Sequence, residues 1–269
     1  MTSQIETNKA VESNAQGRPV ALVTGGRQGI GLAIVTALAA AGFNVAFTAR
    51  SSTDSCSEII AECESLGAKA KYIASDLGDL SGHQALVQQV VLWGGGLDCL
   101  VNNAGVGTLA RGDLLELTTE SFDHVMSTNL RGTLFLSQAV VRWMLDNPSA
   151  HYRSMITISS VSALMASPER ADYCMSKAAM TMMTKSFALR LAADDIGVFE
   201  LRPGIIQTGM TQAVAEKYDK RIADGLVPAR RWGLPADIAR AVLPFASGDM
   251  AFASGSAIEL DGGLSINRL

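Results

Sequence analysis

Short runs of apolar residues alternate with longer helical patterns along most of the chain. Each run has the length of a strand and is mostly hydrophobic at consecutive positions. Such strands are buried on both faces, which is typical of a parallel sheet covered by helices on both sides. The pattern predicts seven strands, at residues 20–23, 44–48, 70–74, 97–101, 155–158, 198–201 and 257–260.

Helical patterns fill the intervals between these strands. Several of them end at a glycine or a proline, as helices commonly do. The predicted helices cover residues 30–41, 54–66, 79–93, 118–147, 171–193 and 235–246. Because strands and helices alternate with no linker, repeat or break in composition, we expect one α/β domain over residues 19–269, a Rossmann-type doubly wound parallel sheet of about seven strands with helices on both faces.

Two segments depart from this pattern. Residues 1–18 are polar and lack the apolar core of a signal peptide, so we expect a disordered leader there. Residues 208–234 form a long, partly polar stretch that contains several glycines and a proline. A stretch of this length between regular elements is often a functional loop, and we expect a substrate lid.

Composition and charge exclude some classes of function. The chain has 269 residues, is 48% hydrophobic and carries a net charge of −4, which disfavours a nucleic-acid partner. No apolar run reaches the roughly 18 residues that a membrane span requires. The four cysteines form no Cys-x-x-Cys pair and have no histidine cluster beside them. Free thiols in a reducing cytoplasm, with no metal site, are therefore expected.

A glycine-rich loop follows the first predicted strand and opens a helix, at residues 24–31 (TGGRQGIG). Glycines let the backbone turn sharply and approach a pyrophosphate, and the helix N-terminus offers N–H groups and a positive dipole. The strand–loop–helix context predicts a dinucleotide site. The loop residues expected to contact the cofactor are Gly25, Arg27, Gln28, Gly29, Ile30 and Gly31.

The end of the second strand indicates which dinucleotide binds. An acidic residue there would accept hydrogen bonds from the ribose hydroxyls of NAD. The sequence reads TARSS at residues 48–52, with no carboxylate before Asp54, which we interpret as a helix cap. Arg50 can pair with a 2′-phosphate, and Arg27 can supply a second cation. With Ser51 beside Arg50, this segment favours NADP(H) over NAD(H).

Two further strand ends are candidates for the adenosine side. Asp76 and Leu77 follow the third strand, where Asp76 either meets the adenine edge or caps the next helix. Asn102, Asn103, Ala104 and Gly105 follow the fourth strand. Small residues there let the chain pass close to the adenine and ribose, and the asparagines can fix the turn.

Tyr173 and Lys177 lie four residues apart in a predicted helix, so both can face the same side. A free phenol has a pKa of about 10, and a nearby cation lowers it toward the operating range of a general acid or base. Cys174 is an alternative nucleophile, but no histidine stands near it in the sequence.

Taken in order, these motifs resemble the short-chain dehydrogenase/reductase family, and within it the 3-oxoacyl-[acyl-carrier-protein] reductase branch. The resemblance covers Val20 to about Gly263. It rests on the following matches: Thr24-Gly25-x-x-x-Gly29-x-Gly31, Asn102-Asn103-Ala104-Gly105, Asn129, Ser160, Tyr173-x-x-x-Lys177, Pro203-Gly204 with Thr208, and Asp261-Gly262-Gly263.

The resemblance implies a role for each matched residue. Tyr173 would be the general acid or base, and Lys177 would hold the nicotinamide ribose and lower the pKa of Tyr173. Ser160 would hydrogen-bond the substrate oxygen, the thirteen-residue spacing to Tyr173 distinguishing it from Ser159 and Ser162. Asn129 would hold a water that connects Lys177 to solvent. The residues that would line the nicotinamide side are Pro203, Gly204, Ile206 and Thr208.

The function expected is therefore reversible, NADP(H)-dependent reduction of a carbonyl to a secondary alcohol. Two alternatives are a non-catalytic nucleotide sensor, which the retained site residues disfavour, and a sugar-nucleotide epimerase or dehydratase, which the loop spacing disfavours. The substrate stays open between a carrier-bound 3-oxoacyl group and a free ketone or sugar-like polyol. An acidic carrier protein would need basic patches, and the ends of the two long helices carry Asp146, Asp194 and Asp195 instead.

Surplus apolar positions on the helices at 118–147 and 171–193 predict burial against other subunits, and the family resemblance implies a homotetramer. Arg230, Arg231 and Trp232 either dock an anionic substrate or pack the lid onto the body.

Overall fold

Seven parallel strands form one sheet in the order β3-β2-β1-β4-β5-β6-β7. The computed structural model describes residues 17–50 and 56–268. The strands are β1 (Val20–Val23), β2 (Asn44–Ala49), β3 (Ala70–Ala74), β4 (Cys99–Asn102), β5 (Arg153–Ile158), β6 (Ile196–Pro203) and β7 (Ala257–Leu260). The predicted fold class is confirmed: a doubly wound, parallel α/β sheet.

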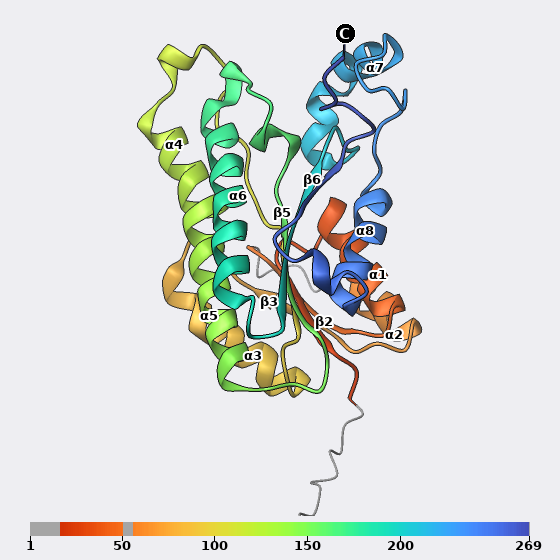
Figure 1. Cartoon of the computed structure of the whole chain (residues 1–269). Helices are drawn as coiled ribbons and strands as arrows, with labels where there is room; N and C mark the ends of the chain where they lie inside the picture. Colours follow the sequence, from red (N-terminus) through yellow and green to blue (C-terminus); the bar gives the residue numbers. More distant parts are fainter. Residues whose placement is uncertain (1–16, 51–55, 269) are drawn as a thin grey trace, which may run out of the picture.

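Helices cover both faces of the sheet, with α3 to α6 on one side and α1, α2 and α8 on the other (Figure 1). The helices of the described residues are α1 (Gly29–Ala40), α2 (Ser57–Ser65), α3 (His83–Gly94), α4 (Thr119–Met126), α5 (Thr133–Asp146), α6 (Ala171–Leu191), α7 (Ala215–Ala223) and α8 (Pro235–Ser247). Within residues 17–50 and 56–268, none of them is long and apolar enough to cross a membrane.

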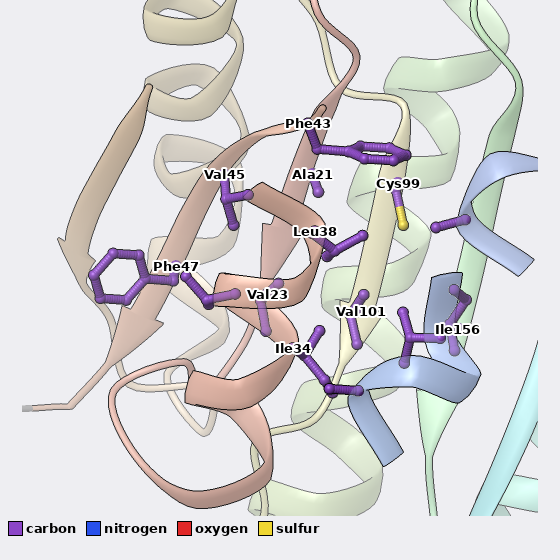
Figure 2. Close-up of a cluster of buried hydrophobic side chains, with 14 of the residues drawn as sticks. Ala21, Val23, Ile34, Leu38, Phe43, Val45, Phe47, Cys99, Val101 and Ile156 are labelled. Atoms are coloured by element: carbon purple, nitrogen blue, oxygen red, sulfur yellow. The ribbon is translucent and has the colours of Figure 1, made fainter. Parts of the chain in front are cut away.

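An apolar core lies on each face of the sheet. One packs α1 and α8 against the strands, and Figure 2 shows Ile34 and Leu38 of α1 beside Val23 and Val101. The other packs α3, α5 and α6 against the opposite face, around residues such as Met155. Every residue of β1 and β4 is buried, which explains why these strands are hydrophobic at nearly every position.

The strand order reverses between β1 and β4, which pair with each other while the chain continues outward in both directions. At such a switch point the loops after the two strands diverge and leave a crevice at the carboxyl ends, where open α/β sheets bind ligands. The glycine-rich loop follows β1, and Asn103 to Gly105 follow β4. The fold therefore brings two of the predicted cofactor segments to one place.

Two segments differ from their predicted form. Residues 208–234, expected to be irregular, contain a 3-10 helix at Gly209–Val214 and helix α7. The predicted long helix at 118–147 is divided into α4, a π-helical turn at Ser127–Gly132, and α5. The hydrophobic pattern missed this turn because the extra residue barely alters the apolar spacing on either side. Most of the predicted leader, residues 1–16, lies outside the described residues.

Candidate active site

The glycine-rich loop is shaped by close backbone approaches that only glycine permits. Gly25 and Gly29 have φ of 68° and 56°, in the left-handed region. A Cβ on Gly31 would lie 2.1 Å from the Gly25 carbonyl oxygen. Gly31 therefore lets the start of α1 pack against the loop. A tight turn leading into a helix N-terminus is the shape that a pyrophosphate requires, so the loop fits a dinucleotide.

The chain after β4 holds this loop in place. The Asn103 side chain donates to the carbonyl oxygens of Thr24 and Gly25, at 2.9 and 3.1 Å. The Thr24 hydroxyl accepts from the backbone N–H groups of Asn103 and Ala104, both at 3.0 Å. The Asn103 side chain thus supports the glycine loop, and the hydrogen bonds from Asn103 and Ala104 to the Thr24 hydroxyl keep the backbone after β4 close to that loop.

The adenosine side is defined by the ends of β2 and β3. Arg50 is exposed at the end of β2, and Ser51 lies outside the described residues. The charge of Arg27 acts on the thiol of Cys56 and the phenol of Tyr72, lowering the pKa of each against the larger effect of burial. Arg27 therefore lies within electrostatic range of Cys56, at the start of α2, and of Tyr72 on β3.

Asp76 does not cap the helix that follows it. Its Oδ1 accepts from the N–H of Gly78 at 2.9 Å. Asp79 takes the capping role, accepting from the N–H of Ser81 at 3.0 Å. The alternative that Asp76 caps the next helix is thus wrong, while its expected contact with adenine stays a prediction. Leu77, beside it, is buried, and its carbonyl oxygen lies against Gly132.

Ser160, Tyr173 and Lys177 converge at the carboxyl end of β5. Ser160 follows this strand, and its Oγ accepts from the N–H of Ser162 at 3.1 Å. Lys177 is buried, and its Nζ donates to the carbonyl oxygen of Ile158 at 3.2 Å and lies 5.6 Å from the centre of the Tyr173 ring. The helical spacing that the sequence suggested does place the phenol and the ammonium on one side of α6.

The expectation that Lys177 lowers the pKa of Tyr173 is not met in this structure. Burial raises the pKa of the Tyr173 phenol, against the charge of Arg170 and hydrogen bonding with the Ser160 side chain. Burial also lowers the pKa of Lys177 to about 8, only partly offset by the nearby Glu200 carboxylate. Desolvation thus penalises both charged forms, and the cation that most stabilises the phenolate is Arg170.

Asn129 lies in the π-helical turn between α4 and α5 and is fully buried. Its Nδ2 donates to the Val106 carbonyl oxygen at 2.9 Å and to Ser176 Oγ at 3.2 Å, while its Oδ1 accepts from the Val106 N–H at 2.8 Å. A Cβ on Gly105 would lie 3.2 Å from Asn129 Oδ1 and 3.7 Å from Lys177 Nζ. The buried amide therefore joins α6 to the chain after β4, beside Lys177.

The segment after β6 completes the site. A parallel bridge joins Ile206 to Gly233, so both ends of the predicted lid are tied to the end of β6. A Cβ on Gly29 would lie 3.4 Å from Thr208 Cγ2, which sets Thr208 beside the glycine loop. Gly204 packs against the backbone of Asp261 so closely that a Cβ would lie 2.7 Å from it. Predicted site residues that follow β1, β4, β5 and β6 therefore lie together at the carboxyl ends of the strands.

Comparison with known proteins identifies the family. A family model described as short chain dehydrogenase matches residues 19–219. The chain belongs to the short-chain dehydrogenase/reductase family. Members of this family are oxidoreductases that act on carbonyl and CH–OH groups and bind a nicotinamide dinucleotide, and this chain is one of them.

Three relatives show the kinds of enzyme that this chain is similar to. The chain is 54% identical to a 3-oxoacyl-[acyl-carrier protein] reductase from Brucella melitensis whose crystal structure is a complex with NAD, with a TM-score of 0.92 and coverage of 95% of this chain and 100% of that one. It is 33% identical over 247 residues to a 3-oxoacyl-[acyl-carrier-protein] reductase of Thermotoga maritima, covering 92% of this chain and 98% of the relative. It is also 33% identical over 252 residues to a 2-dehydro-3-deoxy-D-gluconate 5-dehydrogenase of Dickeya dadantii, covering 93% and 96%.

Within this family frame, the structure reveals a buried charge that the motifs did not indicate. Glu200, in the middle of β6, is buried and accepts hydrogen bonds from the hydroxyls of Ser159 and Thr181 and from Arg202 Nε, the last at 2.9 Å. Arg202 also pairs with Glu259 at 2.8 Å. Charged residues are rarely buried in an apolar strand, so Glu200 within the predicted sixth strand and Arg202 directly after it are a signal in the sequence for a buried ion pair.

Arg231 and Trp232 prove to be structural. Arg231 Nη1 donates to Asp237 Oδ2 at 2.6 Å, and Trp232 Nε1 donates to Asp219 Oδ1 at 2.6 Å. These bonds pack the segment 208–234 on itself and onto α8. Cys174 Sγ lies 3.8 Å from the Met165 carbonyl oxygen, in a contact with backbone. Among the residues the structure covers, no group of His, Cys, Asp and Glu side chains could hold a metal ion.

Proposed function

We propose that this protein reversibly reduces a carbonyl compound to a secondary alcohol with NADP(H), and that Tyr173 is its general acid and base. The observation that supports this most is the meeting of Ser160, Tyr173 and Lys177 at the carboxyl end of β5, beside Gly105 in the chain after β4. The bound nicotinamide would supply the hydride. The protein residues would orient the carbonyl and manage the proton.

The electrostatics suit the reductive direction. Because burial raises the pKa of Tyr173, the phenol is protonated at neutral pH and ready to donate. Ser160 and Tyr173 would both donate to the oxygen on which negative charge develops in the transition state. Lys177 would hold the ribose hydroxyls of the cofactor. Asn129 would position Ser176 and, through a water, help to exchange the proton with solvent.

The dinucleotide would lie across the switch point between β1 and β4. We assign its contacts to the loop after β1, to the ends of β2 and β3, to the chain after β4, and to the segment after β6. The residues are Gly25, Arg27, Gln28, Gly29, Ile30, Gly31, Arg50, Ser51, Asp76, Leu77, Asn103, Ala104, Gly105, Tyr173, Lys177, Pro203, Gly204, Ile206 and Thr208.

NADP(H) is preferred in this proposal because Arg27 and Arg50 are available to a 2′-phosphate and the end of β2 carries no carboxylate for the ribose hydroxyls. Arg50 is exposed at the end of β2, where a 2′-phosphate would lie. The relative from Brucella melitensis was crystallised with NAD, so both cofactors belong in the test. Arg50→Gln should lower kcat/KM for NADPH and leave that for NADH within about threefold. A loss shared equally by both would contradict the assignment.

Two substrate classes follow from the relatives, a 3-oxoacyl group on a carrier protein and a free oxo sugar acid. The helix ends do not favour a carrier protein. Asp194 at the end of α6 pairs with Arg190 at 2.9 Å, so that arginine is partly neutralised, and Asp146 ends α5. A free carbonyl compound therefore suits this surface better.

We also propose that residues 208–234 close over the substrate, that the protein works in the cytoplasm, and that it is a homotetramer with α5 and α6 at an interface. Met182 and Leu189 on α6 are 63% and 83% exposed in the single chain, and Phe135 on α5 is 41% exposed. Apolar side chains exposed along two neighbouring helices suit a contact with another subunit. A monomer in sedimentation velocity at micromolar concentration would refute the tetramer.

The decisive experiment is a panel of carbonyl compounds with NADPH and NADH, followed at the nicotinamide absorbance, for the wild type and for Tyr173→Phe. The variant should lose about 10²–10⁴-fold in kcat while cofactor binding persists. Tyr152→Phe is the matched control, because Tyr152 precedes β5 at the opposite end of that strand. Wild-type turnover by Tyr173→Phe on an accepted substrate would show that the assignment is wrong.

A further inference from the structure

One arginine lies beside the reacting groups, and its only assigned role is its effect on the pKa of the Tyr173 phenol. Arg170 immediately precedes α6, and its guanidinium carbon lies 5.2 Å from the centre of the Tyr173 ring. Its Nη2 donates to Ser162 Oγ at 3.1 Å, two residues from Ser160. The side chain is therefore held between the Tyr173 ring and the loop that carries Ser160 and Ser162.

The charge of Arg170 is not neutralised by a neighbouring acid. Asp172 is buried, and its oxygens accept from the Tyr173 N–H and the Ser121 hydroxyl. Glu169 is exposed, and no ion pair joins any carboxylate to Arg170 in the described part of the chain. A half-buried cation with one neutral hydrogen-bond partner retains donors for an anion.

The position is also unfavourable for the helix itself. The residue that precedes a helix is preferably Ser, Thr, Asp or Asn, because its side chain can accept from the free N–H groups of the first turn. Arg170 makes no such bond, and a cation at this end opposes the positive pole of a 21-residue helix. Asp172 in the first turn already complements the positive helix end, so a bound anion would be attracted by the guanidinium rather than by the helix. The stability of α6 therefore does not account for an arginine here.

We infer that Arg170 is the specificity-determining residue of this site and binds a carboxylate on the substrate, so that the preferred substrate is a small oxo acid or an acidic oxo sugar rather than a neutral ketone or a thioester. This inference rests on the proposed function. A carboxylate paired with the guanidinium would leave a carbonyl group a few bonds away beneath the hydroxyls of Ser160 and Tyr173. The pairing would fix which end of the substrate faces the nicotinamide.

The test compares matched substrates that differ in a negative charge and one methyl group. Reduction of 3-oxobutanoate and of its methyl ester would be followed with the preferred cofactor. Longer oxo acids would extend the acid series, and 2-dehydro-3-deoxy-D-gluconate would be assayed in the reverse direction, by oxidation of its 5-hydroxyl with the oxidised cofactor. The variants are Arg170→Met, Arg170→Lys and, as a matched control, Arg190→Met at the far end of α6. The ratio of kcat/KM for acid and ester is the readout, because a general folding defect would lower both equally.

The wild type and Arg190→Met should prefer the acid by roughly 10- to 150-fold, the value of a charged hydrogen bond. Arg170→Met should bring the ratio to within about threefold of unity, mainly through KM, and Arg170→Lys should retain part of the preference. Equal use of acid and ester by the wild type, or an unchanged ratio in Arg170→Met, would overturn the inference while leaving the reductase function intact. Binding of NADPH without turnover of any compound in either series would overturn the proposed function itself, and with it this inference.

Discussion

Helices α1 and α6 both begin at the carboxyl ends of the strands, yet they bury opposite kinds of residue (Figure 1). The buried positions of α1 are glycine and aliphatic residues, including Ile34, Val35 and Leu38. The first two turns of α6 instead bury Asp172, Ser176 and Lys177, and the apolar positions follow only after them. Burial of α1 therefore stabilises the fold, whereas the first two turns of α6 bury polar and charged groups at a cost in stability.

This contrast teaches where the energy of the fold resides. Apolar burial is favourable in proportion to area and needs no specific partner. Buried polar groups must each find a hydrogen-bond partner, or they cost free energy. Asp172, Ser176 and Lys177 all have partners, from Ser121, Tyr173 and Ile158. Hydrogen bonds thus offset the cost of burying polar groups in the first part of α6 without a net gain in stability. Three experiments test this comparison with α1.

The largest expected effect is on the apolar helix. Leu38→Ala should lower the free energy of unfolding by about 2–5 kcal/mol, because Leu38 is fully buried in the core between α1 and the sheet. Denaturant unfolding followed by circular dichroism would measure this. Leu92→Ala on α3 is the control, since Leu92 is 85% exposed and should change stability by less than about 0.5 kcal/mol. Equal effects at both sites would remove the basis of the comparison.

The second effect concerns the charge buried on α6. Burial lowers the folded-state pKa of Lys177 from 10.5 to about 8, so above pH 8 the unfolded chain binds more protons than the folded one. The stability of the wild type relative to Lys177→Met should therefore be constant below pH 8 and rise between pH 8 and 10.5, by roughly 3 kcal/mol at most. Paired unfolding curves from pH 7 to 10 would test the sign. A relative stability that falls with rising pH would contradict a buried, destabilised ammonium.

The smallest effect distinguishes a buried from an exposed serine on the same helix. Ser176 Oγ donates to the Tyr173 carbonyl oxygen at 2.7 Å and accepts from Asn129, whereas Ser186 Oγ makes the corresponding bond to Met182 on the exposed face. Ser176→Ala should cost about 1 kcal/mol because it removes a partner from a buried amide. Ser186→Ala should be close to neutral in the same unfolding assay. Neutral behaviour of both variants would mean that the Asn129 amide does not depend on Ser176.

Most of the fold was accessible from the sequence because its strands are buried on both faces. All seven strands and the helices that separate them follow from continuous apolar runs and periodic helical patterns. The exceptions have a local cause. Helix α7 is strongly polar and has only Ile222 buried, so it gives little apolar signal. The π-helical turn at Ser127–Gly132 inserts one residue without changing the composition around it.

The chemistry was accessible for a different reason, the fixed spacing of short motifs. The glycine spacing at Gly25, Gly29 and Gly31 predicts a tight loop. The four-residue spacing of Tyr173 and Lys177 predicts that both side chains lie on one face of a helix. Arg170 and Glu200 belong to no motif, so their roles depend on which side chains the fold packs around them. Arg170 meets Tyr173 and Ser162, and Glu200 meets Ser159, Thr181 and Arg202.

The order of elements, the loop that fits a dinucleotide, and the pairing of a tyrosine with a lysine can all be read from the sequence. The direction in which the two pKa values shift depends on the fold, because desolvation depends on everything packed around a side chain and not on its spacing. Burial reversed the expected shift of Tyr173, and the folded chain placed Arg170, rather than Lys177, as the cation that most opposes it. Local spacing sets which groups can meet, whereas the surrounding packing sets the direction in which their pKa values shift.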